Sequence, residues 1–129
     1  MQNDIRTLIP QNKFDTDRAE QAVAAGYPAV EPILPELVEW IQDSNWPVAR
    51  VLAPFLGSIG TPLIPHIKKI MASDDNIWKY WTLTYLVQDS PEVAAALRDD
   101  LQRCADSPTD EERAEGLDEL ARTILQRNQ

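Results

Sequence analysis

A helical pattern that repeats along the sequence constrains the fold of this chain more than any other feature. The Gly-x-Pro turn at residues 26–28 returns at residues 60–62. A second match, with a similar spacing, relates Val48, Leu52, Ala53 and Leu56 to Trp78, Thr82, Leu83 and Leu86. A period of roughly 30–34 residues that holds two helices is typical of a helical solenoid, in which each helix pair covers the bare face of the next. We therefore predict an all-α chain with about three helix pairs and a closing C-terminal helix.

Apolar residues recur at helical intervals along the chain, and no segment alternates with the period of two that a half-buried strand shows. The expected helices span about 16–25, 29–42, 47–58, 62–72, 77–87, 91–105 and 109–126. Their expected N-terminal caps are Asp15 or Thr16, Asn45, Ser90 and Thr109. Thr109 has a glutamate three residues later, which is the spacing of a capping box. Gly26 is expected to end the first helix in a left-handed conformation.

The length of 129 residues indicates one domain over 1–129, with core repeats at about 16–105 and a capping helix at about 109–126. No apolar run approaches the roughly 18 residues of a membrane span. The first ten residues, MQNDIRTLIP, lack the apolar stretch of a signal peptide. We therefore expect a cytoplasmic protein.

Charge and residue counts exclude several classes of partner and site. The chain has 21 acidic and 12 basic side chains and a net charge of −9, whereas nucleic acids and anionic membranes attract basic surfaces. We expect neither as a partner. The single cysteine, Cys104, excludes an internal disulfide, and the single histidine, His66, excludes a site with two histidine ligands. The chain is accordingly expected to hold no metal and no cofactor.

No catalytic motif is present. The sequence contains no nucleophile elbow, phosphate-binding loop, HExxH motif or dinucleotide fingerprint. The carboxylate pairs Glu36/Glu39 and Glu111/Glu115 have the spacing of solvent-facing helix positions and need no catalytic explanation. These observations favour a protein that is not an enzyme.

The segment from Leu56 to Pro62, with the sequence LGSIGTP, resembles the turn of short HEAT-like helical repeats. Pro65 in the helix after it and Pro54 in the helix before it match the prolines that often kink such helices. The likeness covers roughly residues 26–105. It implies a short right-handed α-solenoid and carries nothing about chemistry. The Thr-Pro-Leu sequence at 61–63 also resembles an ankyrin signature, but it occurs once and lacks the histidine that follows in ankyrin repeats.

The chain as a whole is similar to a family of small bacterial HEAT-like proteins, a domain of unknown function. The residues that carry this likeness are Leu8-Ile9-Pro10, Lys13-Phe14-Asp15, Gly26-Tyr27-Pro28, Glu31-Pro32-Ile33-Leu34-Pro35, Asn45-Trp46-Pro47-Val48-Ala49, Pro65-His66-Ile67 and Trp78-Lys79-Tyr80-Trp81. Two positions depart from the HEAT pattern. Ala49 stands where the repeat usually has an arginine, and Lys79 fills the equivalent position of the next repeat.

The middle of the chain holds the candidate binding residues. Residues 44–88 carry two acids and four bases, whereas residues 89–119 carry eleven acids and three bases. The middle segment is thus the one with a positive balance, and it also holds most of the aromatic side chains that supply contact area at interfaces. The candidates are Trp46, Arg50, His66, Lys69, Lys79 and Tyr80.

Several of these residues also have a structural interpretation. Trp46 is either an anchor for a partner or a ring that packs over the preceding helix against Trp40. His66 is either a pH-sensitive group or an ordinary packed or surface histidine. Trp78 is expected to belong to a core stripe, and Cys104 is expected to be a buried structural thiol.

The leading hypothesis is a non-enzymatic interaction module, either an adaptor, an inhibitor or an immunity-type protein, that presents a curved helical surface to a protein partner. The chain itself is expected to be a monomer or a weak dimer. In a HEAT-like stack, the inner surface would include Glu31, Glu39, His66, Lys69, Arg98 and Gln102. The alternative is a protein that handles a small ligand or chromophore. It requires an aromatic pocket lined by Trp46, Tyr80 and Trp81, with His66 or Arg50 beside them.

Overall fold

The computed structural model describes residues 4–128, and this part of the chain is helical and contains no strand. The prediction of an all-α protein is confirmed. Three short 3-10 helices are η1 (Ile5–Leu8), η2 (Glu31–Ile33) and η3 (Thr61–Leu63), and η4 (Leu83–Val87) is a π-helical turn. The α-helices are α1 (Thr16–Ala25), α2 (Leu34–Glu39), α3 (Pro47–Ile59), α4 (Ile64–Met71), α5 (Asn76–Thr82), α6 (Pro91–Ala96), α7 (Arg98–Asp106), α8 (Asp110–Ala114) and α9 (Leu117–Arg127).

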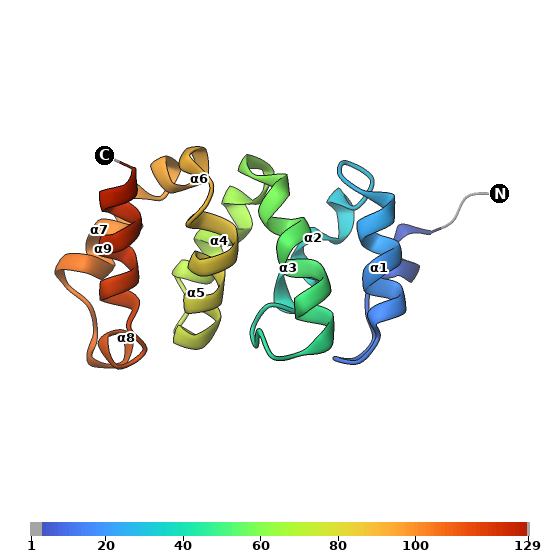
Figure 1. The fold of residues 1–129 in the computed structure, drawn as a ribbon, viewed down its shortest axis with the longest axis horizontal. Coiled ribbons are helices and arrows are strands. Elements are labelled where there is room, and N and C mark those ends of the chain that lie inside the picture. Colours follow the sequence, from blue (N-terminus) through green and yellow to red (C-terminus); the bar gives the residue numbers. More distant parts are fainter. Residues whose placement is uncertain (1–3, 129) are drawn as a thin grey trace.

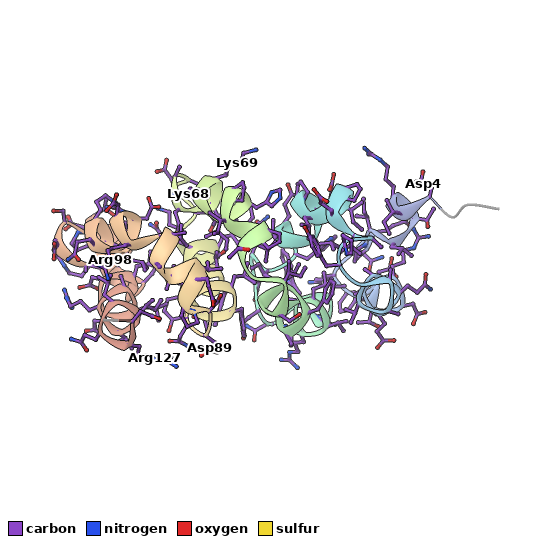
Figure 2. All side chains as sticks on the ribbon, turned by 90° about the horizontal axis from the view of Figure 1, so that it is seen from above. Asp4, Lys68, Lys69, Asp89, Arg98 and Arg127 are labelled. Carbon is purple, nitrogen blue, oxygen red and sulfur yellow. The ribbon has the colours of Figure 1, made fainter. Side chains whose placement is uncertain are left out.

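The helices lie side by side in two layers (Figures 1 and 2). In the first layer α1 contacts α3, α3 contacts η4, and α9 contacts both α5 and η4. In the second layer η1 contacts η2 and α2 contacts α4, and an ion pair between Lys68 and Asp100 joins α4 to α7. Figure 1 shows that the helices follow one another in chain order from one end of the molecule to the other. The second and fourth predicted helices correspond to segments that include α2 and α4, which lie side by side.

Local polar residues fix several helix starts. The side chain of Asp15 accepts a hydrogen bond from the Arg18 amide and caps α1, as expected. The predicted capping box is also present: the Glu112 amide donates to Thr109 Oγ1 at 3.0 Å, and the Thr109 amide donates to Glu112 Oε1 at 2.8 Å. Gly26 ends α1 with φ 75° and ψ 178°. This positive φ agrees with the prediction, but the ψ value lies outside the left-handed helical region that was expected.

Prolines account for the helices that are shorter than predicted. The expected helix over 29–42 follows the cis Tyr27–Pro28 bond and divides into η2 and α2. Pro35 has no N–H and cannot donate the hydrogen bond that would continue an α-helix back through residues 31–33. Those residues form the 3-10 turn η2 directly before α2. The same arrangement, with prolines in the first turns, divides the expected helix over 62–72 into η3 and α4.

Three further predictions about helix ends were wrong. The helix over 91–105 breaks at the buried Leu97, whose φ and ψ of −103° and 13° separate α6 from α7. The helix over 109–126 breaks at Gly116, which takes a left-handed conformation with φ 78° and ψ 16° that glycine adopts without a steric penalty. Trp46, rather than Asn45, occupies the N-cap position of α3, and no side chain caps this helix because the indole of Trp46 has no hydrogen-bond acceptor.

The core runs between the two layers along the whole molecule. Leu56 on α3 and Ile67 on α4 are both fully buried. Other large side chains that are fully or almost fully buried include Ile33, Leu34, Leu37, Ile41, Leu52, Leu63, Leu83, Leu86, Leu97, Leu101, Leu117 and Ile124. This continuous row of aliphatic side chains supplies most of the hydrophobic stabilisation.

The contact between α3 and η4 is unusually close. The amide of Gln88 donates to the carbonyl of Leu83 at 2.9 Å, which is the i to i+5 bond of a π turn. The turn brings the carbonyl oxygen of Tyr85 towards α3, where a β-carbon on residue 57 would lie only 2.6 Å from it. Gly57 is therefore required by the approach of the two backbones.

No single helix between residues 4 and 128 is long and apolar enough to cross a membrane. By length and composition alone, α3 and the η3–α4 segment together would be long and apolar enough. The two are bent by 108° relative to each other.

Candidate functional site

A groove between α2 and α4 brings several of the sequence candidates together. It forms a cavity of about 170 Å³ that also reaches the beginning of α5. We call it the α2–α4 groove, and its lining residues are Pro35, Val38, Glu39, His66, Lys69, Ile70 and Trp78. Three of the six residues expected on the inner surface, namely Glu39, His66 and Lys69, lie in this groove.

Trp78 forms one wall of the groove. Its indole Nε1–H donates to the carbonyl oxygen of Val38 at 3.1 Å and so holds the ring against α2. Trp78 was predicted to occupy the core position that Val48 has in the preceding repeat. Val48 is fully buried, but Trp78 is only half-buried, because the larger ring extends beyond that position to the neighbouring helix. The ring, Pro35 and Ile70 give the groove an apolar wall.

The rim of the groove carries charges of both signs. Glu39 lies on α2, and His66 and Lys69 lie on α4. Burial lowers the pKa of His66, the neighbouring Lys69 lowers it further, and Glu36 partly opposes the shift, so the imidazole is neutral near pH 7. Figure 2 shows Lys68 and Lys69 at the edge of the second layer, opposite the edge that holds Asp89 and Arg127. The exposed Lys69 thus supplies the positive charge of the groove.

The other sequence candidates lie outside the groove. Trp46 packs edge-to-face on Trp40, with ring centroids 5.8 Å apart and an interplanar angle of 69°, as in the second interpretation of this residue. Arg50 lines a different cavity, beside Tyr85, and Tyr80 lines a third, beside α9. None of these three cavities is lined by more than one of the residues that the small-ligand alternative requires.

Among the predicted binding residues, Lys79 differs most from its expected exposure. It was proposed as a binding residue, but its side chain is only 6% exposed and its Nζ lies 3.4 Å from Glu112 Oε2. A buried ammonium group needs a counter-ion, because burial removes its hydration. Lys79 therefore joins α5 to α8 through this ion pair, and its charge is paired and almost wholly buried.

Glu112 is the buried centre of a polar cluster that also contains Lys79, Arg103, Cys104 and Thr109. Arg103 binds the Glu112 carboxylate with both terminal nitrogens, at 3.0 Å to Oε1 and 2.5 Å to Oε2. These bonds to Arg103, with help from the Thr109 amide and Lys79, lower the pKa of Glu112 to about 2. The cluster thus ties α5, α7 and α8 together through one carboxylate.

Cys104 lies beside this cluster, with its Sγ 3.6 Å from Glu112 Oε2. Burial raises the pKa of Cys104 to about 11, and the Glu112 carboxylate adds to the shift. The thiol is protonated near neutral pH and is a poor nucleophile. The prediction of a buried thiol is confirmed. Between residues 4 and 128 no group of three or more His, Cys, Asp or Glu side chains is placed to hold a metal ion.

Sequence reasoning identified Glu112 only as a capping residue and assigned Pro35 no role. The capping box depends on local spacing, whereas the ion pairs of Glu112 involve residues 33 and 9 positions away. The repeat did contain a signal for Lys79, because residue 79 is equivalent to Ala49, which is buried.

A comparison with family models gives one result that covers most of the chain. The model of a domain of unknown function, DUF5071, matches residues 8–125. A comparison with curated proteins gave no match. The matched range includes every helix from α1 to α8 and most of α9, together with all residues of the α2–α4 groove and of the Glu112 cluster. The chain belongs to the DUF5071 family, a family defined as a domain of unknown function.

Proposed function

We propose that this chain is a non-enzymatic protein-interaction module whose contact surface centres on the α2–α4 groove. The observation that carries the proposal is the combination of an apolar wall, formed by Pro35, Ile70 and Trp78, with charged side chains at the rim. Protein interfaces commonly bury an apolar anchor in a pocket at the centre and surround it with polar groups. The groove has this arrangement.

The size of the groove favours a protein partner over a cofactor. Sites for drug-sized ligands usually enclose about 300–1,000 Å³. The groove measures about 170 Å³, and an engineered cavity of about 150 Å³ is sufficient for benzene. The groove therefore accommodates one large side chain of a partner.

Charge limits which partner segments fit. An aliphatic or aromatic anchor would enter the groove between Glu39 and Lys69, and a carboxylate beside the anchor would meet Lys69. His66 is neutral near pH 7 and would donate or accept a hydrogen bond there. A partner with a basic residue at this position would face Lys69 and be disfavoured.

The fold is proposed to be a short right-handed α-solenoid of HEAT-like pairs. Support comes from the repeated two-helix pattern of the sequence and from the side-by-side order of α1, α3, η4 and α9 in one layer. A helical stack of this kind presents an extended surface that can bind a partner protein and needs no catalytic residues to do so. A cytoplasmic bacterial adaptor, inhibitor or immunity-type protein is the corresponding biological role.

The test is affinity capture with a matched pair of charge-reversal variants. Purified wild-type protein, Lys69→Glu and Lys13→Glu are immobilised and exposed to an extract of the source organism, and bound proteins are quantified by mass spectrometry. Lys13 is an exposed lysine that precedes α1 and does not line the groove, so it serves as the control. We expect a partner that the wild type and Lys13→Glu retain and that Lys69→Glu loses by about tenfold or more.

The captured protein is then purified, and its affinity for the three forms is measured by calorimetry. Equal affinity for all three would show that the groove is not the contact surface. A chemical reaction catalysed by the chain and abolished by His66→Ala would overturn the proposal that it is not an enzyme.

A further inference from the structure

We propose that this protein has a second binding surface, on the first layer, for a proline-rich segment of a partner protein. The surface consists of three aromatic side chains, Tyr80, Trp81 and Tyr85, which we call the aromatic ridge. This inference goes beyond the proposed function, because no ridge residue lines the α2–α4 groove.

The three rings of the ridge contact one another in sequence. Tyr80 and Trp81 meet edge-to-face with centroids 5.2 Å apart, and Trp81 stacks on Tyr85 with centroids 5.9 Å apart. Tyr85 is 38% exposed, although it is a large aromatic residue on a packed helix. Tyr80 and Trp81 are partly buried beside it, and Tyr80 packs against the core. The exposed face of Tyr85 and the accessible parts of the other two rings together offer aromatic area to a partner.

Hollows on both sides continue the ridge. A cavity of about 170 Å³ lies between Tyr85 and α3, where Arg50 and Pro54 line it. A cavity of about 480 Å³ lies between Tyr80 and α9, where Glu115 and Glu119 line it. An extended segment that crosses the ridge would therefore place side chains in a hollow at each end.

The polar atoms of the ridge are available to a ligand. The hydroxyl groups of Tyr80 and Tyr85 and the indole N–H of Trp81 form no hydrogen bond with the residues from 4 to 128, and none of them is among the buried polar atoms without a partner. The indole of Trp78, in contrast, is satisfied by Val38. The ridge thus offers three donors next to apolar ring surfaces.

A polyproline II segment has the complementary chemistry. Its backbone carbonyl oxygens have no internal partner and accept hydrogen bonds, and its proline rings pack on aromatic surfaces. Ring spacings of 5.2 and 5.9 Å give the ridge a length that about four residues would cover at about 3.1 Å per residue. The segment is stiff before binding, so little conformational entropy is lost.

The charges on both sides predict the ends of the segment. Arg50 is exposed on one side, and Glu115 and Glu119 are exposed on the other. None of the three takes part in an ion pair with another residue in the described part of the chain. A proline-rich segment with an acidic residue at the end near Arg50 and a basic residue at the other end would satisfy all three charges.

The test uses fluorescein-labelled Asp-Pro-Pro-Ala-Pro-Pro-Arg, the same peptide in reverse order, and a control in which Gly and Ser replace the prolines. Binding to the full chain is measured by fluorescence anisotropy. We expect at least one proline peptide to bind about tenfold more tightly than the control. Tyr85→Ala should weaken that binding by about tenfold, and Tyr85→Phe, which loses only the hydroxyl donor, by about threefold.

Matched variants show whether the peptide binds at the ridge or elsewhere on the protein. Phe14→Ala removes an aromatic ring that is 67% exposed and lies outside the ridge, and it should leave binding unchanged. Arg50→Glu should weaken binding, whereas Lys69→Glu, the groove variant, should not. Circular dichroism confirms that each variant is folded. The proposal is overturned if neither proline peptide binds up to about 1 mM, or if Tyr85→Ala and Arg50→Glu bind as tightly as the wild type.

Discussion

Replacement of Glu112 by glutamine should destabilise this protein more than any other conservative change of an acidic side chain that we describe. The Glu112 side chain is 2% exposed and pairs with both Lys79 and Arg103. Glutamine has nearly the same shape and keeps the capping interaction with the Thr109 amide. The substitution therefore removes the negative charge and replaces the acceptor oxygen that faces Lys79 and Arg103 by an amide donor.

The expected loss is about 3 kcal/mol at pH 7. Removing one partner of a buried ion pair costs about 3–5 kcal/mol, because the remaining charge stays buried without compensation. The pKa leads to a similar figure. A decrease from the ordinary value of 4.5 to about 2, at about 1.4 kcal/mol per unit, corresponds to about 3 kcal/mol. We favour the lower end because the side chain of Arg103 is 46% exposed, so water screens its share of the interaction.

The pH dependence gives an independent check. Folding lowers the pKa of Glu112, so its contribution to stability is fully present above pH 4.5 and is lost as the pH falls towards 2. The Gln variant has no such carboxyl group. The difference in free energy of unfolding between the two proteins should therefore decrease to about half its value by pH 3. Urea denaturation, followed by circular dichroism between pH 3 and 7, measures it.

Glu111→Gln is the matched control, since Glu111 is exposed and lies one residue earlier in the same helix. It should change the free energy of unfolding by no more than about 0.5 kcal/mol. The reasoning would be refuted if Glu112→Gln cost less than about 1 kcal/mol, or if its difference from the wild type did not depend on pH.

Three further changes have defined outcomes. Leu56→Ala should cost about 2–5 kcal/mol in urea denaturation, because Leu56 is fully buried, and a loss under about 1 kcal/mol would contradict its place in the core. Trp46→Ala should cost about 2 kcal/mol and lower the melting temperature, because the ring packs on Trp40, whereas unchanged melting with lost partner binding would show that Trp46 is an anchor. Cys104, with its pKa raised to about 11, should resist iodoacetamide at pH 7.5 in the folded protein and react in urea, and mass spectrometry would detect equal labelling in both states if this were wrong.

Local signals in the sequence predicted the helical class and many of the helix starts. Asp15 and Thr109 act within their own turns, so their roles could be recognised from spacing. The break at Leu97 could not be predicted in this way, because an ordinary leucine leaves the helical region there without a proline or glycine to cause it. Tertiary packing outweighs helix propensity at such positions.

The site was predicted less well than the fold, for a physical reason. His66 and Lys69 are one turn apart on α4, so the prediction that they share a surface needed only helical geometry. The burial of Lys79 had a signal in the repeat, through the equivalent and buried Ala49. Its ion pair with Glu112, 33 residues away, had no signal in the sequence. Charge balance along the sequence therefore indicated a segment with a positive balance, but it could not indicate that the charge of Lys79 is buried and paired with Glu112.

The close contact of Gly57 with the carbonyl of Tyr85 has a consequence for how this molecule can deform. Where side chains separate two helices, rotamer changes allow the helices to slide or tilt. Here the backbones themselves determine the spacing, since even a β-carbon on residue 57 would lie 2.6 Å from that oxygen. We therefore expect the junction between α3 and η4 to be a stiff point in the middle of the layers, and any bending of the molecule to occur at the junctions on either side of it. The surface that spans this junction, from Arg50 to Tyr85, would then keep its shape if the two ends of the molecule moved.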